Sequence, residues 1–424
     1  MNNFPSDWKK LPIKNVTVRT SQRDPRRQPT TRFRYVDVSS VSNRSFRIVE
    51  ATEIEGSAAP SRARKKIRTG DVLFATVRPT LKRVALVPPE LDGQIASTGF
   101  IVLRADPEKL NPHYLYGRIL TDAFTKRMGE LERGASYPAV RDSDVLNEGI
   151  PVPPLPEQRR IAAVLGVVQR AMEQQERLLA LTAELKKALL HQIFTAGLRG
   201  EPQKQTEIGP VPESWEVVPL GSLAKVGNGS TPKRDNDGYW EGGSIPWLNS
   251  AKIHERFITQ ADQFVTELAV KESHLPHVKP GSLLIAITGQ GKTLGNSALV
   301  SFETCINQHL AYAQFTSPRV VPEFVLWFMQ TRYEHLRSIS QAAGSTKGAL
   351  TCGYLKTYPI PIPSLAEQRD VAAVFAALDR KEKIHENKNA SLIDLFRTLL
   401  HQLMTAQIRV HDLDLPELEA ATQA

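Results

Sequence analysis

The most regular pattern in the chain is a spacing of apolar positions that alternates between four and three residues. It runs over residues 161–193 and again over 371–403, and the second stretch repeats the first 210 positions later without an insertion. The residues before each stretch also repeat, as LPEQR at 155–159 and LAEQR at 365–369. Apolar positions spaced in this way line one face of a helix that pairs with another helix. We therefore expect two long helices of equal length.

The paired helices are predicted to share a seam that is apolar at both ends and polar in the middle. If they run antiparallel, Ile161 faces Leu403 and Gln175 lies near Asn389. A polar layer inside a coiled coil fixes the register of the two helices at some cost in stability. The alternative is that each helix packs only on the globular part of its own repeat. The predicted seam residues are Ile161, Leu165, Val168, Gln175 and Leu189, with Val371, Phe375, Leu378, His385, Asn389 and Leu399.

A segment with a mixed strand and helix pattern precedes each long helix. Short apolar runs bounded by glycine or proline predict strands at 72–77, 101–104 and 283–288. Helices that begin with proline are predicted at 112–128 and 322–338. The run GDVLFA of the first segment returns as GSLLIA in the second, so the globular parts are copies as well. Their offset changes along the segment, which predicts that the two domains differ more than the helices do.

Proline and glycine mark the connections between these parts. The stretches 151–156 and 359–363 are expected to be stiff extended connectors, because proline fixes φ and cannot continue a strand ladder. The patterns predict an α+β chain in which two mixed α/β domains are separated by an antiparallel coiled coil, with a pseudo-twofold internal repeat. The expected parts are a first globular domain at 1–152, a helical region at 153–200, a polar linker at 201–211, a second globular domain at 212–362, a helical region at 363–410 and a tail at 411–424.

Length and composition limit the class of protein. With 424 residues the chain is too long for one typical domain, and a hydrophobic share of 41% is ordinary for a globular protein. Cys305 and Cys352 cannot form a disulfide framework or a four-ligand zinc site, and the ten histidines show no metal-binding spacing. No apolar run is long enough to span a bilayer, and the first residues lack the pattern of a signal peptide. We therefore expect a cytoplasmic protein with no membrane partner and no bound metal.

The positive charge lies in the first third of the chain. Residues 1–150 hold 26 Lys and Arg against 17 Asp and Glu, whereas the remaining residues hold 28 of each kind. The net charge of +9 therefore belongs to the first globular segment. Such an excess favours a polyanion as the partner. The alternative is a basic surface that is only solvated.

Basic residues cluster beside the predicted strands of both globular segments. Lysine and arginine supply phosphate contacts, and arginine can also read guanine in the major groove. The second segment holds fewer of them, which favours readout by side-chain amides there. Loops 134–137 and 344–348 hold equivalent places before the proline connectors, with a plain turn as the alternative. The predicted DNA-contacting residues are Arg26, Arg27, Arg62, Arg64, Lys65, Lys66, Arg68, Arg78, Lys82 and Arg83 in the first segment, and Lys233, Arg234, Lys252, Gln290, Lys292, Ser345 and Lys347 in the second.

One motif would fit an enzyme instead. The run AITGQGKT at 286–293 follows a predicted strand and is similar to a relaxed phosphate-binding loop that ends in Lys292 and Thr293. Such a loop must open a helix, and the residues that follow are a poor helix start. The chain also lacks the Asn/Asp-Pro-Pro-Tyr/Phe tetrapeptide of amino-methyltransferases and the Pro-Asp pair of a common nuclease pattern. A nucleotide hydrolase and a scaffold that binds only proteins are the two alternatives to DNA recognition.

The layout resembles the specificity subunit of type I restriction-modification systems. The motifs that carry the resemblance are IPVPPLPEQ at 150–158, its counterpart at 360–368, GNGSTP at 227–232, and YW followed by IPWL within 239–248. The resemblance covers nearly the whole chain. The first globular domain departs from the pattern, because it lacks the GSTP and IPW motifs.

The resemblance implies two target-recognition domains whose helical regions form the coiled coil. Each domain would read one half of a split, asymmetric site on double-stranded DNA, and the helices, about 65 Å long, would set the spacer between the halves. Two copies of a methylation subunit would dock on the coiled coil, bind S-adenosylmethionine and methylate adenine. Motor-nuclease subunits that use ATP and magnesium could join them. The chain itself would bind no cofactor and catalyse no reaction.

Overall fold

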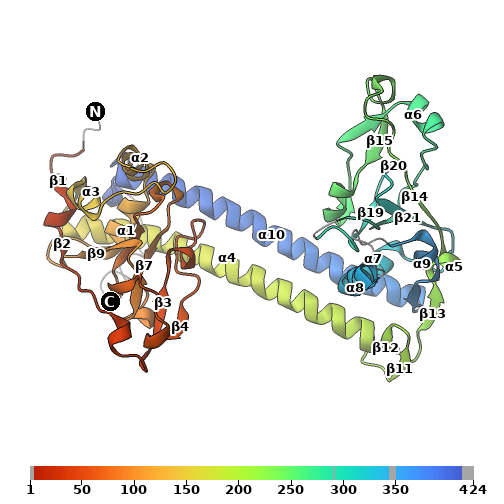
Figure 1. The fold of residues 1–424 in the computed structure, drawn as a ribbon, viewed down its shortest axis with the longest axis horizontal. Helices are drawn as coiled ribbons and strands as arrows, with labels where there is room; N and C mark the ends of the chain where they lie inside the picture. The colour runs from red at the N-terminus through yellow and green to blue at the C-terminus, as the bar shows by residue number, and fades with distance from the viewer. Residues whose placement is uncertain (1–3, 290–291, 343–349, 413–424) are drawn as a thin grey trace. The chain divides into compact units, whose positions relative to one another are not determined.

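The computed structural model describes residues 4–289, 292–342 and 350–412 (Figure 1). The chain forms two compact units. Unit 1 joins Met1–Arg177 with Asn387–Ala424, and unit 2 consists of Leu178–Glu386. Two long helices, α4 (Leu155–Ala196) and α10 (Leu365–Met404), each contribute one end to unit 1 and the other end to unit 2.

The repeated LPEQR and LAEQR motifs attach the first turn of each long helix to a globular domain. In unit 1 the buried side chain of Gln158 forms three hydrogen bonds, at 2.7–3.0 Å, with the backbone of Lys109, Asn111 and Pro153. In unit 2 the buried Gln368 forms three equivalent backbone bonds at 2.8–2.9 Å. A buried amide is stable only when its donors and acceptor are satisfied. The glutamine therefore ties each helix to the domain beside it, which explains why this part of the motif occurs twice.

Unit 1 contains two four-stranded sheets and three short helices in the described residues. The sheets have the strand orders β2-β9-β6-β7 and β4-β3-β8-β5, and β1 pairs antiparallel with β10. The strands are β1 (Lys9–Pro12), β2 (Thr17–Val18), β3 (Arg32–Val36), β4 (Thr52–Glu55), β5 (Ala63–Lys66), β6 (Val72–Ala75), β7 (Val84–Leu86), β8 (Ile95–Ser97), β9 (Phe100–Ala105) and β10 (Gly149–Val152). The helices are α1 (Pro112–Leu120), α2 (Asp122–Glu130) and α3 (Asp142–Asn147).

The largest core of unit 1 joins the sheet that contains β6 to α1, α2 and the ends of both long helices. All four residues of β6 are buried, and Phe74 packs edge-on against Phe124 of α2. Ile161 of α4 and Leu403 of α10 belong to the same core. A second core, which includes Leu73, lies on the other side of β6. Because each fully buried side chain of this size contributes about 2 kcal/mol, these cores hold the strand ends of the first domain in fixed positions.

Unit 2 contains a five-stranded and a three-stranded sheet in the described residues. Their strand orders are β14-β21-β18-β19-β16 and β17-β15-β20, while β13 pairs with β22 and β11 with β12. The strands are β11 (Gln203–Thr206), β12 (Gly209–Pro212), β13 (Glu216–Pro219), β14 (Ala224–Asn228), β15 (Ile245–Leu248), β16 (Phe257–Ile258), β17 (Gln263–Val265), β18 (Leu283–Ala286), β19 (Ser297–Val300), β20 (Cys305–Ile306), β21 (Leu310–Phe315) and β22 (Pro359–Ile362). The helices are α5 (Leu220–Leu223), α6 (Glu267–Glu272), α7 (Pro322–Thr331), α8 (Tyr333–Ala342) and α9 (Cys352–Thr357).

Aromatic side chains fasten both long helices to unit 2. Phe194 of α4 packs edge-on against Trp215, with ring centres 6.1 Å apart, and lies 5.3 Å from Phe324 of α7. The ring centres of Phe375 of α10 and Trp327 of α7 lie 4.9 Å apart. Aromatic pairs of this kind add to the free energy gained from burial alone. The helix ends are therefore part of the core of this unit.

The predicted pairing of the long helices is confirmed in each unit. In unit 1 Met172 of α4 and Phe396 of α10 line one small cavity, and in unit 2 Lys186 of α4 contacts Glu382 of α10 at 3.1 Å. These contacts require antiparallel helices, and none of the predicted seam residues is exposed. In each unit the ends of the long helices pack on the globular domain as well as on each other. Gln175 is buried and the Asn389 side-chain oxygen is buried; the contact between these two residues stays a prediction.

Two helix predictions were wrong about continuity. The sequence predicts single helices at 112–128 and 322–338, whereas the structure has α1 with α2 and α7 with α8. The break between α1 and α2 lies at Thr121, whose backbone is extended and whose hydroxyl accepts a hydrogen bond from the Phe124 N–H. A threonine at this position caps the following helix instead of continuing the preceding one. At the second break Arg332 leaves the helical conformation (φ −98°, ψ 1°).

The segments around the prolines are more ordered than predicted. The strand predictions are confirmed by β6, β9 and β18. The proline connectors are extended over 151–154 and 359–363, and β10 and β22 also pair with a second strand. In a two-stranded sheet each strand keeps one free edge, where the missing N–H of a proline costs no ladder bond. The prediction was wrong for Leu155 and Pro156, which begin helix α4, because proline is tolerated in the first turn of a helix. The predicted linker at 201–211 contains the β11–β12 hairpin, in which Val211 is buried.

Candidate nucleic-acid interface

Several predicted contact residues of the first domain form ion pairs within that domain. Asp24 lies 3.2 Å from Arg26 and 3.0 Å from Arg64, and the Arg26 hydrogen bond lowers the pKa of Asp24. The other pairs are Arg62 with Asp37 at 3.5 Å, Lys65 with Asp142 at 3.0 Å, and Lys82 with Asp122. A neighbouring carboxylate weakens the attraction of each of these residues for a phosphate. Charge density along the sequence therefore overestimates the free positive charge of the surface.

The remaining predicted residues of the first domain fall into two groups. Arg83 is held inside the domain, because its guanidinium donates to the backbone carbonyls of a neighbouring loop. Within the part of the chain that the structure describes, four residues form no ion pair and no side-chain hydrogen bond: Arg27, Lys66, Arg68 and Arg78. All of them except the half-buried Lys66 are exposed. These four are the least engaged of the predicted cations in the first domain, and of them Arg68 and Lys66 interact electrostatically with Asp92.

Arg78 differs from Arg27, Lys66 and Arg68 in its left-handed backbone, a conformation that it shares with Lys82 (φ 53°). Its φ of 48° and ψ of 57° lie in the left-handed region, and its N–H donates to the Pro138 carbonyl at 2.7 Å. Three exposed uncharged side chains occur in the same two loops, namely Val77, Leu81 and Tyr137. Tyr137, 76% exposed, was not predicted from the sequence, although its loop was. We call Val77, Arg78, Leu81 and Tyr137 the first tip.

The predicted residues of the second domain are mostly engaged with neighbours. The guanidinium carbon of Arg234 lies 3.9 Å from the ring centre of Trp240 and 4.9 Å from that of Trp247. Cation–π contacts of this kind hold a guanidinium in one orientation. Lys252 pairs with Glu255 at 2.7 Å, and this hydrogen bond raises the pKa of Lys252. Neither residue is free to move onto a ligand without losing these contacts.

The described residues of the segment after β18 do not have the arrangement of a phosphate-binding loop. The residues after Lys292 turn into strand β19, so no helix begins where a phosphate would sit. The alternative of a nucleotide hydrolase therefore gains no support from the described residues of this segment. Lys233 and Lys292 are exposed. Gln290, Ser345 and Lys347 lie outside the described residues.

A polar network at the same end of β18 was not predicted from the sequence. Thr288 hydrogen-bonds to His309, and Thr231 donates to Gln308. Gln308 and His309 are exposed, and together the four side chains offer both donors and acceptors. We call Thr231, Thr288, Gln308 and His309 the second tip. A search based on charge could not find these residues, because none of them is a lysine or an arginine.

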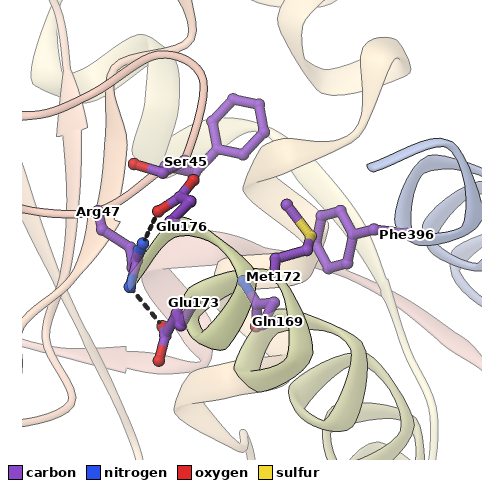
Figure 2. A pocket seen from close by; sticks show the side chains of 8 residues that line it. Ser45, Arg47, Gln169, Met172, Glu173, Glu176 and Phe396 are labelled. Carbon is purple, nitrogen blue, oxygen red and sulfur yellow. Dashed lines mark hydrogen bonds and ion pairs between the residues drawn. The ribbon is translucent and has the colours of Figure 1, made fainter. Parts of the chain in front are cut away.

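The contact between Arg47 and α4 is structural. Figure 2 shows the Arg47 guanidinium between two carboxylates of α4; it lies 3.0 Å from Glu173 and also pairs with Glu176. The cavity beside it is lined by Met172 and Phe396 and holds no more than about one water molecule. This small cavity has no room for a larger ligand, whereas Arg47 and Glu173 also border a wider pocket of about 500 Å³ next to Tyr116. The two ion pairs hold a loop of the first domain on the helix.

No group of three or more His, Cys, Asp or Glu side chains gathers to hold a metal ion in residues 4–289, 292–342 and 350–412. None of the helices in these ranges is long and apolar enough to cross a membrane. Cys305 is buried, and burial raises its pKa to about 11, so its thiol stays protonated at neutral pH.

Comparisons with known proteins agree on one family. The family model described as the type I restriction modification DNA specificity domain matches the chain twice, at residues 5–183 and 212–393. The putative type I restriction enzyme MjaX specificity subunit of Methanocaldococcus jannaschii is 22% identical over 422 residues, which cover 97% of this chain and 96% of that protein. The MjaIX specificity subunit of the same organism is 30% identical over 215 residues, or 48% of each chain.

Two solved structures are similar over most of the chain. One is described as "Structural basis underlying complex assembly and conformational transition of the type I R-M system"; it is 31% identical with a TM-score of 0.59, covering 95% of this chain and 98% of that one. The type I restriction-modification S subunit from M. genitalium has the same TM-score, 0.59, at 17% identity, over 95% of this chain and 97% of that one. The second likeness supports the fold alone.

Proposed function

Since this chain belongs to the family defined by the type I restriction modification DNA specificity domain, we propose that it reads a split, asymmetric site on double-stranded DNA. Each target-recognition domain reads one half of the site. The observation that carries the proposal is that the two equal helices carry domains with unequal tips. The first tip holds an arginine among apolar side chains, and the second is a hydrogen-bonded cluster of threonine, glutamine and histidine side chains. Two domains with different surface chemistry, each attached to one of two equal helices, suit two different half-sites.

The proposed partners are two copies of a methylation subunit, docked on the repeated helices. Leu185 of α4 and Leu395 of α10 occupy positions 210 residues apart and are 50% and 45% exposed. Exposed apolar side chains at equivalent places support two equal docking surfaces. In this proposal S-adenosylmethionine binds to the methylation subunits, and ATP with magnesium binds to motor-nuclease subunits where these are present. The chain contributes recognition, binds no cofactor and catalyses no step.

Phosphate contacts by Arg27, Lys66 and Arg68 predict a strong salt dependence of DNA binding. Replacing all three by alanine is expected to weaken binding to every duplex and to reduce the slope of log affinity against log salt concentration by about three, because each lysine or arginine on a phosphate releases about one counterion. The slope is measured by fluorescence anisotropy with the methylation partner present. Lys187→Ala, an exposed position on α4, is the control and should leave the slope unchanged. An unchanged slope in the triple variant would contradict these phosphate contacts.

The proposed function is tested by mapping methylated adenines in a host genome, with and without this gene. The proposal predicts a motif of two short specified parts around an unspecified spacer, and its disappearance when the gene is deleted. A motif that persists after deletion, or that has no spacer, would remove the proposal.

A further inference from the structure

Arg78 is an exposed residue whose backbone is held by two neighbouring segments of the first recognition domain. It is the third residue after β6, whose four residues are all buried. The neighbouring loop holds it from the other side, since the Val140 N–H donates to the Thr76 carbonyl at 2.9 Å and the Arg78 N–H donates to the Pro138 carbonyl at 2.7 Å. A side chain that starts from such a fixed backbone loses little entropy when it binds.

The backbone at this position favours glycine. A bulky residue rarely adopts a φ of 48°, because its Cβ crowds the following carbonyl, whereas glycine adopts it freely. The run GDVLFA at 70–75 matches GSLLIA at 281–286, and the same alignment places Gly289 (φ 144°) opposite Arg78. An arginine therefore stands where the backbone of the second copy has glycine. Strained residues of this kind cluster at functional sites, and Lys82 in the same loop shares the left-handed conformation (φ 53°).

The surroundings of Arg78 suit a base edge better than a phosphate. Its own loop and the loop beside it expose Val77, Leu81 and Tyr137, none of them charged. Two other cations of these two loops are paired, Lys82 with Asp122 and Arg133 with Asp144. Phosphate tracks use clustered cations, whereas base edges in the major groove are read by single side chains, with arginine on guanine and apolar groups on the thymine methyl.

We infer that Arg78 selects a guanine in the first half-site, with the apolar members of the first tip packed against the adjoining base pair. The inference rests on the proposed function, since it assigns one base of the site to one residue. Arg27 and Arg68, by contrast, contact phosphates and carry no sequence information.

The test is Arg78→Gly in the complete system, read out as the methylated motif of the host genome. The thermal unfolding temperature is expected to stay at or above that of the unaltered chain, because glycine relieves the left-handed strain. The preference for a G·C pair at one position of one half-site is expected to fall about tenfold or more, and the other half-site is expected to be unchanged. Arg78→Lys keeps the charge but loses the planar fork, so it should make the same position degenerate.

Arg27→Ala is the matched control. It should reduce the methylated fraction at all sites alike and leave the motif unchanged. The inference is overturned if Arg78→Gly keeps the full motif, or if the position that becomes degenerate is not a G·C pair. An unaltered system that yields no bipartite motif would instead overturn the proposed function, and the inference with it.

Discussion

Replacing Arg409 with methionine is expected to lower the free energy of unfolding of unit 1 by about 3 kcal/mol. Arg409 follows α10, and its guanidinium bonds to Glu157 at 2.8 and 2.9 Å and to Asp7 at 2.8 Å. The Glu157 side chain is only 10% exposed, and its other donor is the Trp8 indole at 3.1 Å. Without Arg409 a buried carboxylate keeps a single neutral donor, which is the costly case for a buried ion pair. Amide hydrogen exchange in β1, which begins beside Trp8, measures the loss.

The same variant is expected to change how stability depends on pH. The hydrogen bond from Arg409 lowers the pKa of Asp7 below 3.8. A carboxylate with a depressed pKa contributes its full stability above the unfolded pKa and loses it as the pH falls through the folded pKa. The unaltered chain therefore loses this contribution below about pH 4, and Arg409→Met has none to lose. Arg397→Met, an exposed position on α10, is the control. Equal exchange in the Arg409 variant and the unaltered chain would contradict the role of this contact.

Lys186→Met is expected to destabilise unit 2 by about 2 kcal/mol. The Lys186 side chain is 9% exposed, pairs with Asp379 and with Glu382 at 3.1 Å, and lies 5.2 Å from the centre of the Trp327 ring. Breaking a fully buried pair costs about 3–5 kcal/mol, but the two carboxylates are partly solvated and Asp379 keeps two bonds to Arg256 at 2.8 and 2.9 Å. The loss should therefore be smaller. Tryptophan fluorescence during urea unfolding measures it, because Trp8 is the only tryptophan of the sequence outside unit 2.

A second variant separates the effect of the Lys186 charge on stability from the effect of side-chain packing between α4 and α10. The equivalent positions in unit 1 hold Met172 and Phe396, which are apolar. The double variant Lys186→Phe with Glu382→Met copies that pair, and we expect it to regain most of the stability, since an apolar pair can replace a buried ion pair. The neighbouring exposed Lys187→Met is the control and should have no effect. A stable single variant, or a double variant no better than Lys186→Met, would contradict this account of the layer.

The long helices could be predicted because their signal is local and repeated. Apolar spacing identified the seam, and the lack of insertions over the repeat identified the partner helix. The break between α1 and α2 could not be predicted as well. Thr121 ends α1 and caps α2, and the sequence alone does not distinguish a capping threonine from one inside a helix. The ion pair of Lys186 with Asp379 could be predicted only in part. Position 186 fits the four-and-three spacing of the seam, but its pairing with Asp379, and the contact of Asp379 with Arg256, depend on the tertiary fold.

The DNA-contacting residues were harder to predict than the fold. The composition of a loop shows where cations are, but not which of them a carboxylate already holds, as Asp24 holds Arg26 and Arg64. Arg78 looked like its neighbours until its left-handed backbone was known. The sequence favoured readout by side-chain amides in the second domain, but nothing in it singled out Gln308 of the second tip.

The central claim is that each globular domain reads its own half-site, and exchanging one domain tests it most directly. Residues 1–152 are replaced by the corresponding domain of a family member with a different target, and the methylated adenines of the host genome are mapped. The account predicts a hybrid motif in which one half-site takes the sequence read by the donor domain, while the other half-site and the spacer length stay as they were. A motif in which both half-sites change, or neither does, would contradict it.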